Sequence, residues 1–320
     1  MAKFDLMTLG VPMVEFTRSE LDVPLSEPGS FYGPVPAGDP GIALNACVRL
    51  GYRGCYVGVL GGDAFADCFL EQMRRSGIDV SHLRTEARLN TGLSMLTKFS
   101  DGSRRFVFTV PNSAAAAIGP RDLDRELIAQ VRWIHLSGFA LSISASAAAL
   151  HRELIGAVGD DVRISFDPNF RPEVITKEEY LSRSRCVLER CDYFLPSRGE
   201  AALFADRAQS EEDFCRELSR TGKEVALKDG SRGAYAFSAG RERFYPAFRV
   251  TETDATGAGD TFDGALIAAT LDGKGLFEAA AYATAAGALA VTRRGLMEIA
   301  PSRAEIEGLL AAGGAEEAAR

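Results

Sequence analysis

A glycine-rich turn with a carboxylate directly behind it occupies residues 253–265, Thr-Asp-Ala-Thr-Gly-Ala-Gly-Asp-Thr-Phe-Asp-Gly-Ala. An apolar run with helical periodicity follows and continues to Leu271. Such a turn leaves backbone N–H groups unpaired at the positive end of the helix dipole, where they bind anions. Gly257, Ala258 and Gly259 carry at most a methyl group, so an anion can reach those amides. The segment predicts an anion site at a helix N-terminus.

A carboxylate, Asp260, lies within the first turn of this expected helix. The helix N-terminus stabilises its ionised form, so we expect Asp260 to be a weak base at neutral pH. A weak base is sufficient for phosphoryl transfer, because the transition state is loose and depends mainly on positioning and charge stabilisation. The pattern therefore indicates transfer of a phosphoryl group from a nucleotide to a hydroxyl, with Asp260 accepting the proton. The alternative is a structural turn in which Asp260 only caps the helix.

Two other nucleotide motifs are excluded by the same segment. No Gly-Lys-Ser/Thr follows the glycines, so the turn is not a P-loop. It is far from the first strand-like run and lacks the GxGxxG spacing, so it is not a Rossmann dinucleotide turn.

The composition is that of a folded globular protein. The chain has 320 residues, 46% of them apolar, and a net charge of -8, which argues against nucleic acid and anionic membrane partners. This length predicts about two domains, or one α/β body with an appendage. The six cysteines and three histidines show no metal-ligand spacing, so we expect reduced thiols and no zinc site. No apolar run is long enough for a membrane span or an export signal, which predicts a cytoplasmic protein.

Short apolar runs alternate with longer segments of helical periodicity, which is typical of βαβ units in a parallel sheet with helices on either side. The expected strands are 4–10, 55–60, 132–137, 162–167, 193–195 and 225–228. The expected helices are 43–50, 64–76, 145–158, 177–189 and 211–220. The Ala/Gly/Glu-rich tail after Leu310 is expected to be loosely ordered.

Two segments interrupt this alternation. Residues 11–36 are rich in proline, and 90–110 contain an alternating run preceded by an Asp-Gly-Ser turn. Both indicate antiparallel hairpins that leave the body near the ends of its strands, where open α/β sheets bind ligands. We therefore divide the chain into a body, residues 1–10, 37–89 and 111–320, and a β-lid, residues 11–36 and 90–110.

Residues 254–260 closely resemble the DTxGAGD signature of the ribokinase-like (PfkB-type) sugar kinases, with Ala255 in the usual threonine place. Further blocks resemble the same family in the same order along nearly the whole chain: 8–16, 49–51, 58–63, 165–171 and 227–233. The first and fourth of these resemble the 2-keto-3-deoxygluconate kinase and fructokinase branches. The resemblance implies a three-layer α/β/α fold with a mostly parallel sheet and a small β-sheet lid.

The resemblance also implies roles for single residues. Asp260 is then the catalytic base, and the amides of 257–260 form the hole that stabilises the transferred phosphoryl group. Asn169 and Arg171 stand where the family steers the phosphate or a substrate carboxylate, and Gly38 stands where the backbone approaches the sugar.

At the nucleotide end, the resemblance implies ATP and Mg²⁺. The nucleotide-binding positions are Ser197, Lys228, Gly230, Gly233, Gly257 and Gly259. Glu200 is expected to reach Mg²⁺ through water, although Ser197 replaces the usual asparagine of NxxE and weakens contacts there. Lys228 either approaches a nucleotide phosphate or caps a strand end at the surface. Asp254 either shapes the loop or binds a monovalent cation such as K⁺.

The sugar end departs from the family. Ile42 occupies the place of the hydroxyl-binding asparagine, and Asn45, on the same helix face, is the candidate to replace it. Val110 occupies the place of an arginine found in 2-keto-3-deoxygluconate kinases and many fructokinases. Arg105 points to the face of its strand opposite to that of Val110, and Arg104 lies too far from Val110 along the strand. Neither side chain therefore replaces the missing arginine.

We therefore expect an ATP-dependent kinase for a small sugar or sugar acid resembling 2-keto-3-deoxygluconate. The alternatives are a fructose-like ketose, deoxy-sugar or nucleoside kinase, and a relative that binds a ligand without turnover. Relatives pair through their lids, which implies a homodimer. We expect His135 to be a core residue and Asp263 to be a solvated or loop-bonding carboxylate.

Overall fold

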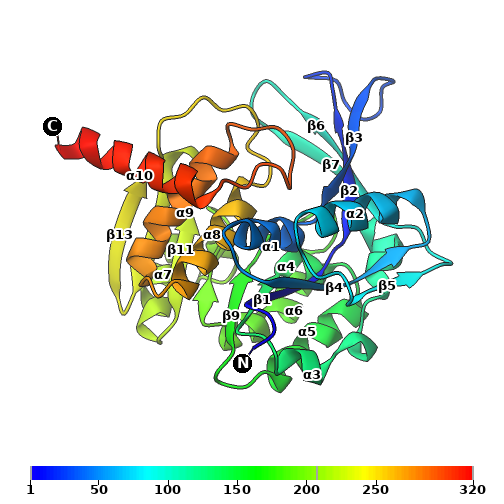
Figure 1. Cartoon of the computed structure of the whole chain (residues 1–320), viewed down its shortest axis with the longest axis horizontal. Helices are drawn as coiled ribbons and strands as arrows, with labels where there is room; N and C mark the ends of the chain where they lie inside the picture. Colours follow the sequence, from blue (N-terminus) through cyan, green and yellow to red (C-terminus); the bar gives the residue numbers. More distant parts are fainter. Residues whose placement is uncertain (1, 207, 319–320) are drawn as a thin grey trace.

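The computed structural model describes residues 2–206 and 208–318, which form two sheets (Figure 1). The larger sheet has nine strands in the order β13-β12-β11-β10-β9-β8-β1-β4-β5. The strands from β10 to β5 in this order, and β10 with β11, pair in parallel, whereas β12 pairs antiparallel with both β11 and β13 at one edge. The strands are β1 (Leu6–Gly10), β4 (Gly54–Gly61), β5 (Leu83–Glu86), β8 (Trp133–Ser137), β9 (Arg163–Asp167), β10 (Tyr193–Phe194), β11 (Glu224–Lys228), β12 (Gly233–Ser238) and β13 (Arg241–Pro246).

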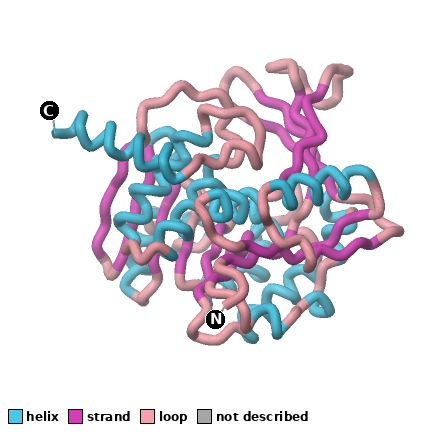
Figure 2. The backbone as a smooth tube through the Cα atoms, in the orientation of Figure 1, coloured by secondary structure: helices cyan, strands magenta, loops and turns pink. Residues whose placement is uncertain are grey.

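Helices cover both faces of this sheet (Figure 2). The helices on one side are α1 (Asp39–Arg49), α2 (Ala64–Arg75), α8 (Ala258–Leu271), α9 (Leu276–Ala290) and α10 (Arg303–Ala318). Those on the other side are α3 (Arg125–Ile128), α4 (Gly138–Ser142), α5 (Ala145–Ala157), α6 (Lys177–Arg190) and α7 (Glu211–Arg220). Strands β1, β4 and β8 are buried along their whole length because they are covered on both faces. The predicted three-layer α/β/α architecture is confirmed.

Three details differ from the sequence-based expectations. Helix α1 begins at Asp39, not at residue 43, because Pro40 fits the first turn of a helix. The sequence analysis did not predict β12 and β13 as strands. Helix α10 continues to Ala318, so residues 311–318 of the expected loose tail have helical backbone.

The smaller sheet has four strands in the order β3-β2-β6-β7 and stands above one end of the body (Figure 1). Its strands are β2 (Met13–Arg18), β3 (Phe31–Ala37), β6 (Gly92–Lys98) and β7 (Arg104–Phe108). Both predicted hairpins are present, β2–β3 and β6–β7, and the parallel pairing of β2 with β6 joins them into one mixed sheet. We call this smaller sheet the lid.

Short junctions connect the lid to the body. Only Val11 and Pro12 separate β1 from β2. Asp63 caps α2 by accepting from the backbone N–H groups of Phe65 and Ala66, and its second oxygen accepts from the backbone N–H of Thr91 at 2.7 Å, just before β6. The lid is thus anchored at the carboxyl ends of the body strands.

In the part of the chain that the structure describes, no helix is both long and apolar enough to cross a membrane. The six cysteines are free thiols, four of them buried, as expected from their spacing.

Candidate active site

The glycine-rich turn opens helix α8 as the sequence predicts. Gly257 is the N-cap residue, with a left-handed φ of 80°. Among the described residues, no backbone carbonyl or side-chain oxygen accepts from the amides of Gly257, Gly259 and Asp260. The turn therefore presents unpaired N–H groups at the positive end of the helix.

Asp260 is half-buried next to these amides. Burial raises the pKa of its carboxyl group well above the ordinary value, and the negative charges of Asp39 and Asp167 raise it further, against the opposing effect of Lys228 and Arg171. The expectation that the helix N-terminus would keep Asp260 a weak base is wrong, because burial, together with the charges of Asp39 and Asp167, raises its pKa. This raised pKa is closer to the pKa of an effective general base at neutral pH.

Lys228, at the end of β11, lies buried beneath the turn. Its Nζ atom is 2.9 Å from Asp167 Oδ2 on β9 and 2.9 Å from Asp263 Oδ2 on α8. A Cβ atom at Gly259 would lie 3.8 Å from the same Nζ. The alternative in which Lys228 caps a strand end at the surface is therefore wrong, since its side chain is only 8% exposed.

Asp263 is fully buried, so the expectation of a solvated or loop-bonding carboxylate is wrong. Both of its carboxylate oxygens accept from Lys228 Nζ. The buried pair joins α8 to β11. His135 is a buried core residue, as expected: its Nδ1 lies 2.9 Å from Ser165 Oγ, and burial lowers its pKa to about 4.

Asp39, which the sequence analysis did not single out, faces Asp260 from the first turn of α1. The Ser137 hydroxyl donates to its Oδ2, whereas its buried Oδ1 has no hydrogen-bond partner in the described chain. Burial raises the pKa of Asp39 to about 6, and Asp167 raises it further, against the hydrogen bond from Ser137 and the charge of Arg171. The sequence signal was an aspartate between a glycine and a proline, a pattern that favours a helix start four residues before the predicted one.

Aromatic rings from the lid line the region around Arg171. The rings of Phe106 and Phe108 on β7 stack with centroids 5.3 Å apart, and Phe108 contacts Phe139 of α4 at 5.2 Å. The guanidinium of Arg171 lies 5.6 Å from the centre of the Phe106 ring. Arg105 is exposed on the opposite face of β7, as expected. The structure thus brings Arg171, Asn169 and Asp260 together with a lid-borne aromatic wall.

Ile42 and Val110, which depart from the family at the sugar end, are packed inside the protein. A Cβ at Gly257 would lie 3.6 Å from Ile42 Cδ1, so Ile42 supports the glycine-rich turn from below. Val110 is fully buried in the 3-10 turn Val110–Asn112. The Asn45 amide donates to the Met297 carbonyl at 2.7 Å, so the alternative in which Asn45 replaces the missing asparagine is wrong.

Gly38 is required by the backbone itself. Its φ is 109°, and a Cβ there would lie 2.1 Å from the carbonyl oxygen of Val11. Any side chain at this position would therefore displace the junction between β1 and the lid.

A cavity of about 650 Å³ lies on the other side of the glycine-rich turn. Five of the predicted nucleotide-binding residues line it: Ser197, Lys228, Gly230, Gly233 and Gly259. Gly257 is not among the lining residues. The sequence analysis missed the apolar part of the wall, which includes Phe248, Val250, Phe262, Ala288 and Val291. The cavity has the size of a cofactor site, with polar groups at the end near α8.

Glu200 lies between two loops near this cavity. Its Oε1 accepts from the backbone N–H of Phe170 at 3.1 Å, and its Oε2 accepts from that of Ser197 at 2.7 Å. Burial raises the pKa of Glu200 to about 7, with a further contribution from Asp167. In the described residues, no group of three His, Cys, Asp or Glu side chains could hold a metal ion. A magnesium ion at this site would therefore depend on the phosphates of a nucleotide for most of its ligands.

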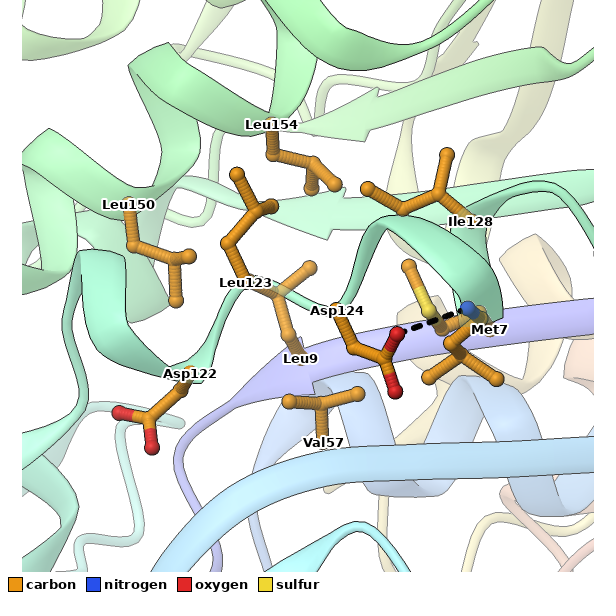
Figure 3. A pocket seen from close by; sticks show the side chains of 10 residues that line it. Met7, Leu9, Val57, Asp122, Leu123, Asp124, Ile128, Leu150 and Leu154 are labelled. Atoms are coloured by element: carbon orange, nitrogen blue, oxygen red, sulfur yellow. Dashed lines mark hydrogen bonds between the residues drawn. The ribbon is translucent and has the colours of Figure 1, made fainter.

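A crevice under α3 is too small to bind a ligand (Figure 3). It is lined mainly by apolar side chains, including Met7, Leu9 and Leu150, and has a cavity volume of about 10 Å³. Asp124 at its edge caps α3. The crevice is a packing gap in the core.

Solved structures with this fold are ribokinase-like kinases. The E. coli protein named "a putative Ribokinase II" matches with a TM-score of 0.90 and 32% identity, over 96% of this chain and 99% of that chain. The same protein has a structure in complex with ATP and Mg²⁺, with a TM-score of 0.89. The fold and the site define a phosphotransferase that acts on an alcohol group.

The family follows from the sequence match. Residues 13–303 match the pfkB family carbohydrate kinase, and the chain belongs to this family. The 2-dehydro-3-deoxygluconokinase of Thermoproteus tenax is 29% identical over 318 residues, covering 97% of this chain and 95% of the relative. Fructokinase-1 of Oryza sativa subsp. japonica is 27% identical over 314 residues, covering 95% of this chain and 97% of the relative. The family predicted from residues 254–260 is confirmed.

Proposed function

We propose that the protein transfers the γ-phosphoryl group of ATP to a hydroxyl of a small sugar or sugar acid resembling 2-keto-3-deoxygluconate. One observation carries the proposal. Asp260 and the unpaired amides of Gly257, Gly259 and Asp260 lie between the 650 Å³ cavity and the cluster of Asp39, Asn169 and Arg171. A nucleotide on one side and an acceptor on the other would meet at the turn.

In this proposal Asp260 orients the acceptor hydroxyl and takes its proton as the new bond to phosphorus forms. The amides of Gly257, Gly259 and Asp260 stabilise the charge on the transferred group. The Lys228 ammonium, beneath the turn, adds positive charge on the nucleotide side. Magnesium bound to the nucleotide would neutralise phosphate charge, and Glu200 would hold it through water. The lid would exclude water so that ATP is not hydrolysed.

Arg171 supports an acceptor that carries a carboxylate. It is the cation that acts on both Asp39 and Asp260, and it faces the aromatic wall. The relatives named 2-dehydro-3-deoxygluconokinase agree with such an acceptor.

The aromatic wall supports the second candidate, a neutral ketose, deoxy-sugar or nucleoside. Phe106 and Phe108 present ring faces that pack on the apolar side of such acceptors. The relatives named fructokinase agree with a ketose.

The test is magnesium-dependent ADP release with 2-keto-3-deoxygluconate, fructose, 2-deoxyribose and adenosine. In an Arg171→Met variant, KM should rise strongly for a sugar acid and little for a neutral sugar, because only the acid loses an ion pair. Arg105→Met, on the exposed face of the lid, is the matched control and should leave both KM values unchanged. An acceptor that raises the thermal unfolding midpoint without ADP release would show a binding protein instead and contradict the kinase proposal.

We also propose that two copies pair through the lid, which carries the exposed apolar side chains of Leu21, Tyr32 and Val107. Light scattering at micromolar concentration should give the mass of a dimer. A monomer mass would contradict this pairing.

A further inference from the structure

An ion pair connects the lid to the loop that enters the glycine-rich turn. Lys98 is the last residue of β6, and its Nζ lies 2.6 Å from Asp254 Oδ2. Asp254 precedes Gly257 by three residues. Across the described chain, no other ion pair joins the lid strands to residues 254–260. The pair is partly shielded from water, with Lys98 26% and Asp254 13% exposed.

The other oxygen of Asp254 is also engaged. Asp254 Oδ1 accepts from the backbone N–H of Thr256 at 3.0 Å and from the Thr256 hydroxyl at 2.7 Å. Although burial raises the pKa of Asp254, the hydrogen bonds from Lys98 and Thr256 lower it below its ordinary value. Asp254 is therefore an anion, and both of its carboxylate oxygens accept hydrogen bonds. The donor to Oδ2 is the positively charged ammonium of Lys98.

A second carboxyl group lies close by. Glu15 of β2 accepts from Ser94 at 3.1 Å and from Thr17 at 3.2 Å, and it faces both Lys98 and Asp254. Burial raises the pKa of Glu15. Among the described residues, the ion-pair partner of Lys98 is Asp254. A cavity of about 20 Å³ adjoins Asp254 and Glu15, and the cationic residue Arg294 is among those that line it.

A monovalent cation, which the family resemblance implies at Asp254, does not fit this arrangement. A metal ion there would need free oxygen ligands, whereas the Asp254 oxygens already accept from an ammonium and from Thr256. The ammonium of Lys98 carries the same single positive charge as K⁺, but it is covalently attached to the lid.

We propose that Lys98 supplies at Asp254 the positive charge that a monovalent cation would otherwise supply, and that it thereby positions the turn at 257–260 when the lid is in place. Lys98 is a positioning residue, because it acts through Asp254 and its loop. The proposal rests on the proposed kinase function and adds that the enzyme works without K⁺. It also means that the loop entering the anion turn gains its counter-charge from the lid.

The first test uses the unmodified protein in about 0.1 M KCl and in tetramethylammonium chloride at the same ionic strength. The thermal unfolding midpoint and the rate of ADP release should be the same in both salts, because the site already holds its cation. A wild-type protein that gains both stability and activity from K⁺ would overturn the proposal. If no acceptor releases ADP, the kinase function fails, whereas the thermal measurement still tests the role of Lys98.

The second test removes the tethered charge. Lys98→Met should lose about tenfold or more in kcat in tetramethylammonium chloride, as expected for loss of a charged hydrogen bond, and KCl should restore much of it. KCl should also raise the unfolding midpoint of this variant but not that of the wild type. Lys98→Arg keeps the charge and should remain independent of K⁺. Arg105→Met, an exposed cation on the neighbouring lid strand, is the control and should behave as the wild type.

Two results with Lys98→Met would contradict the proposal. One is activity equal to the wild type in both salts. The other is a loss that K⁺ does not restore, together with an unfolding midpoint that K⁺ does not raise. If Lys98→Met does not fold, the wild type and Lys98→Arg decide the question, since either one responding to K⁺ would overturn the assignment.

Discussion

Lys228 and Asp263 form a buried ion pair, 2.9 Å from Nζ to Oδ2, one helical turn beyond Asp260. Lys228 ends β11 and Asp263 lies in α8, so the pair fixes the first turn of the helix against the sheet. Asp260 and the unpaired amides precede Asp263 on the same helix. The pair therefore sets the direction in which the anion site faces.

Removal of Lys228 should destabilise the protein more than removal of an exposed lysine. Lys228→Met leaves Asp167 and Asp263 buried without their cation, which should lower the free energy of unfolding by about 3–5 kcal/mol. Urea unfolding measures the change, with Lys274→Met at an exposed position as control. A Lys228→Met protein as stable as the control would show that the pair is not structural.

Replacement of Asp260 should abolish most of the activity and leave the fold intact. Asp260→Asn keeps the size of the side chain but cannot accept the hydroxyl proton, so kcat should fall by about 10²–10⁴-fold. Circular dichroism checks the fold, and ADP release measures the rate. Asp67→Asn, an exposed aspartate in the first turn of α2, is the matched control. Turnover near the wild-type rate in Asp260→Asn would refute its role as the base.

Asp39 should make stability depend on pH. The folded state raises its pKa from 3.8 to about 6, so its contribution to stability is full below pH about 4 and is lost as pH rises through about 6. Over this range the wild type should lose on the order of 3 kcal/mol relative to Asp39→Asn, whose amide does not titrate. Urea unfolding of both proteins at several pH values measures the difference. Parallel pH profiles would contradict the assignment of this pKa to Asp39.

Gly38 and Gly51 offer a matched pair of substitutions. Both have positive φ, 109° and 99°, but only Gly38 has an obstacle, the Val11 carbonyl, 2.1 Å from where a Cβ would lie. Gly51→Ala should cost about 1 kcal/mol for its conformation alone. Gly38→Ala should cost several kcal/mol and lower the thermal unfolding midpoint more, because the junction with the lid must move. Equal costs would show that the contact with Val11 is relieved cheaply.

The sequence alone predicted those features that depend on residues close together along the chain. The segment 254–260 predicted an unpaired helix N-terminus with Asp260 beside it, because a glycine-rich turn and a following apolar run are local patterns. The apolar runs of β1, β4 and β8 predicted a covered parallel sheet for the same reason.

Features that depend on tertiary contacts could not be predicted. Asn45 was a candidate sugar ligand by helix spacing, but its amide is bonded to Met297, 252 residues away in sequence. The pKa of Asp260 was predicted in the wrong direction, because other elements bury it and bring the charges of Asp39 and Asp167 close to it. Lys98 ends a strand of the lid and Asp254 lies in the loop before α8, and nothing in the sequence near either residue indicates the other.

The two-residue connection through Val11 and Pro12 has an evolutionary consequence. In the proposed function, the phenyl rings that would face the acceptor belong to β7 of the lid, whereas the residues that line the 650 Å³ cavity belong to the body. Recombination that exchanged the lid segments of two such genes would alter which alcohol is accepted and preserve the phosphate donor. Diversification of acceptors can thus proceed by grafting, provided that the incoming lid brings its own partner for Asp254.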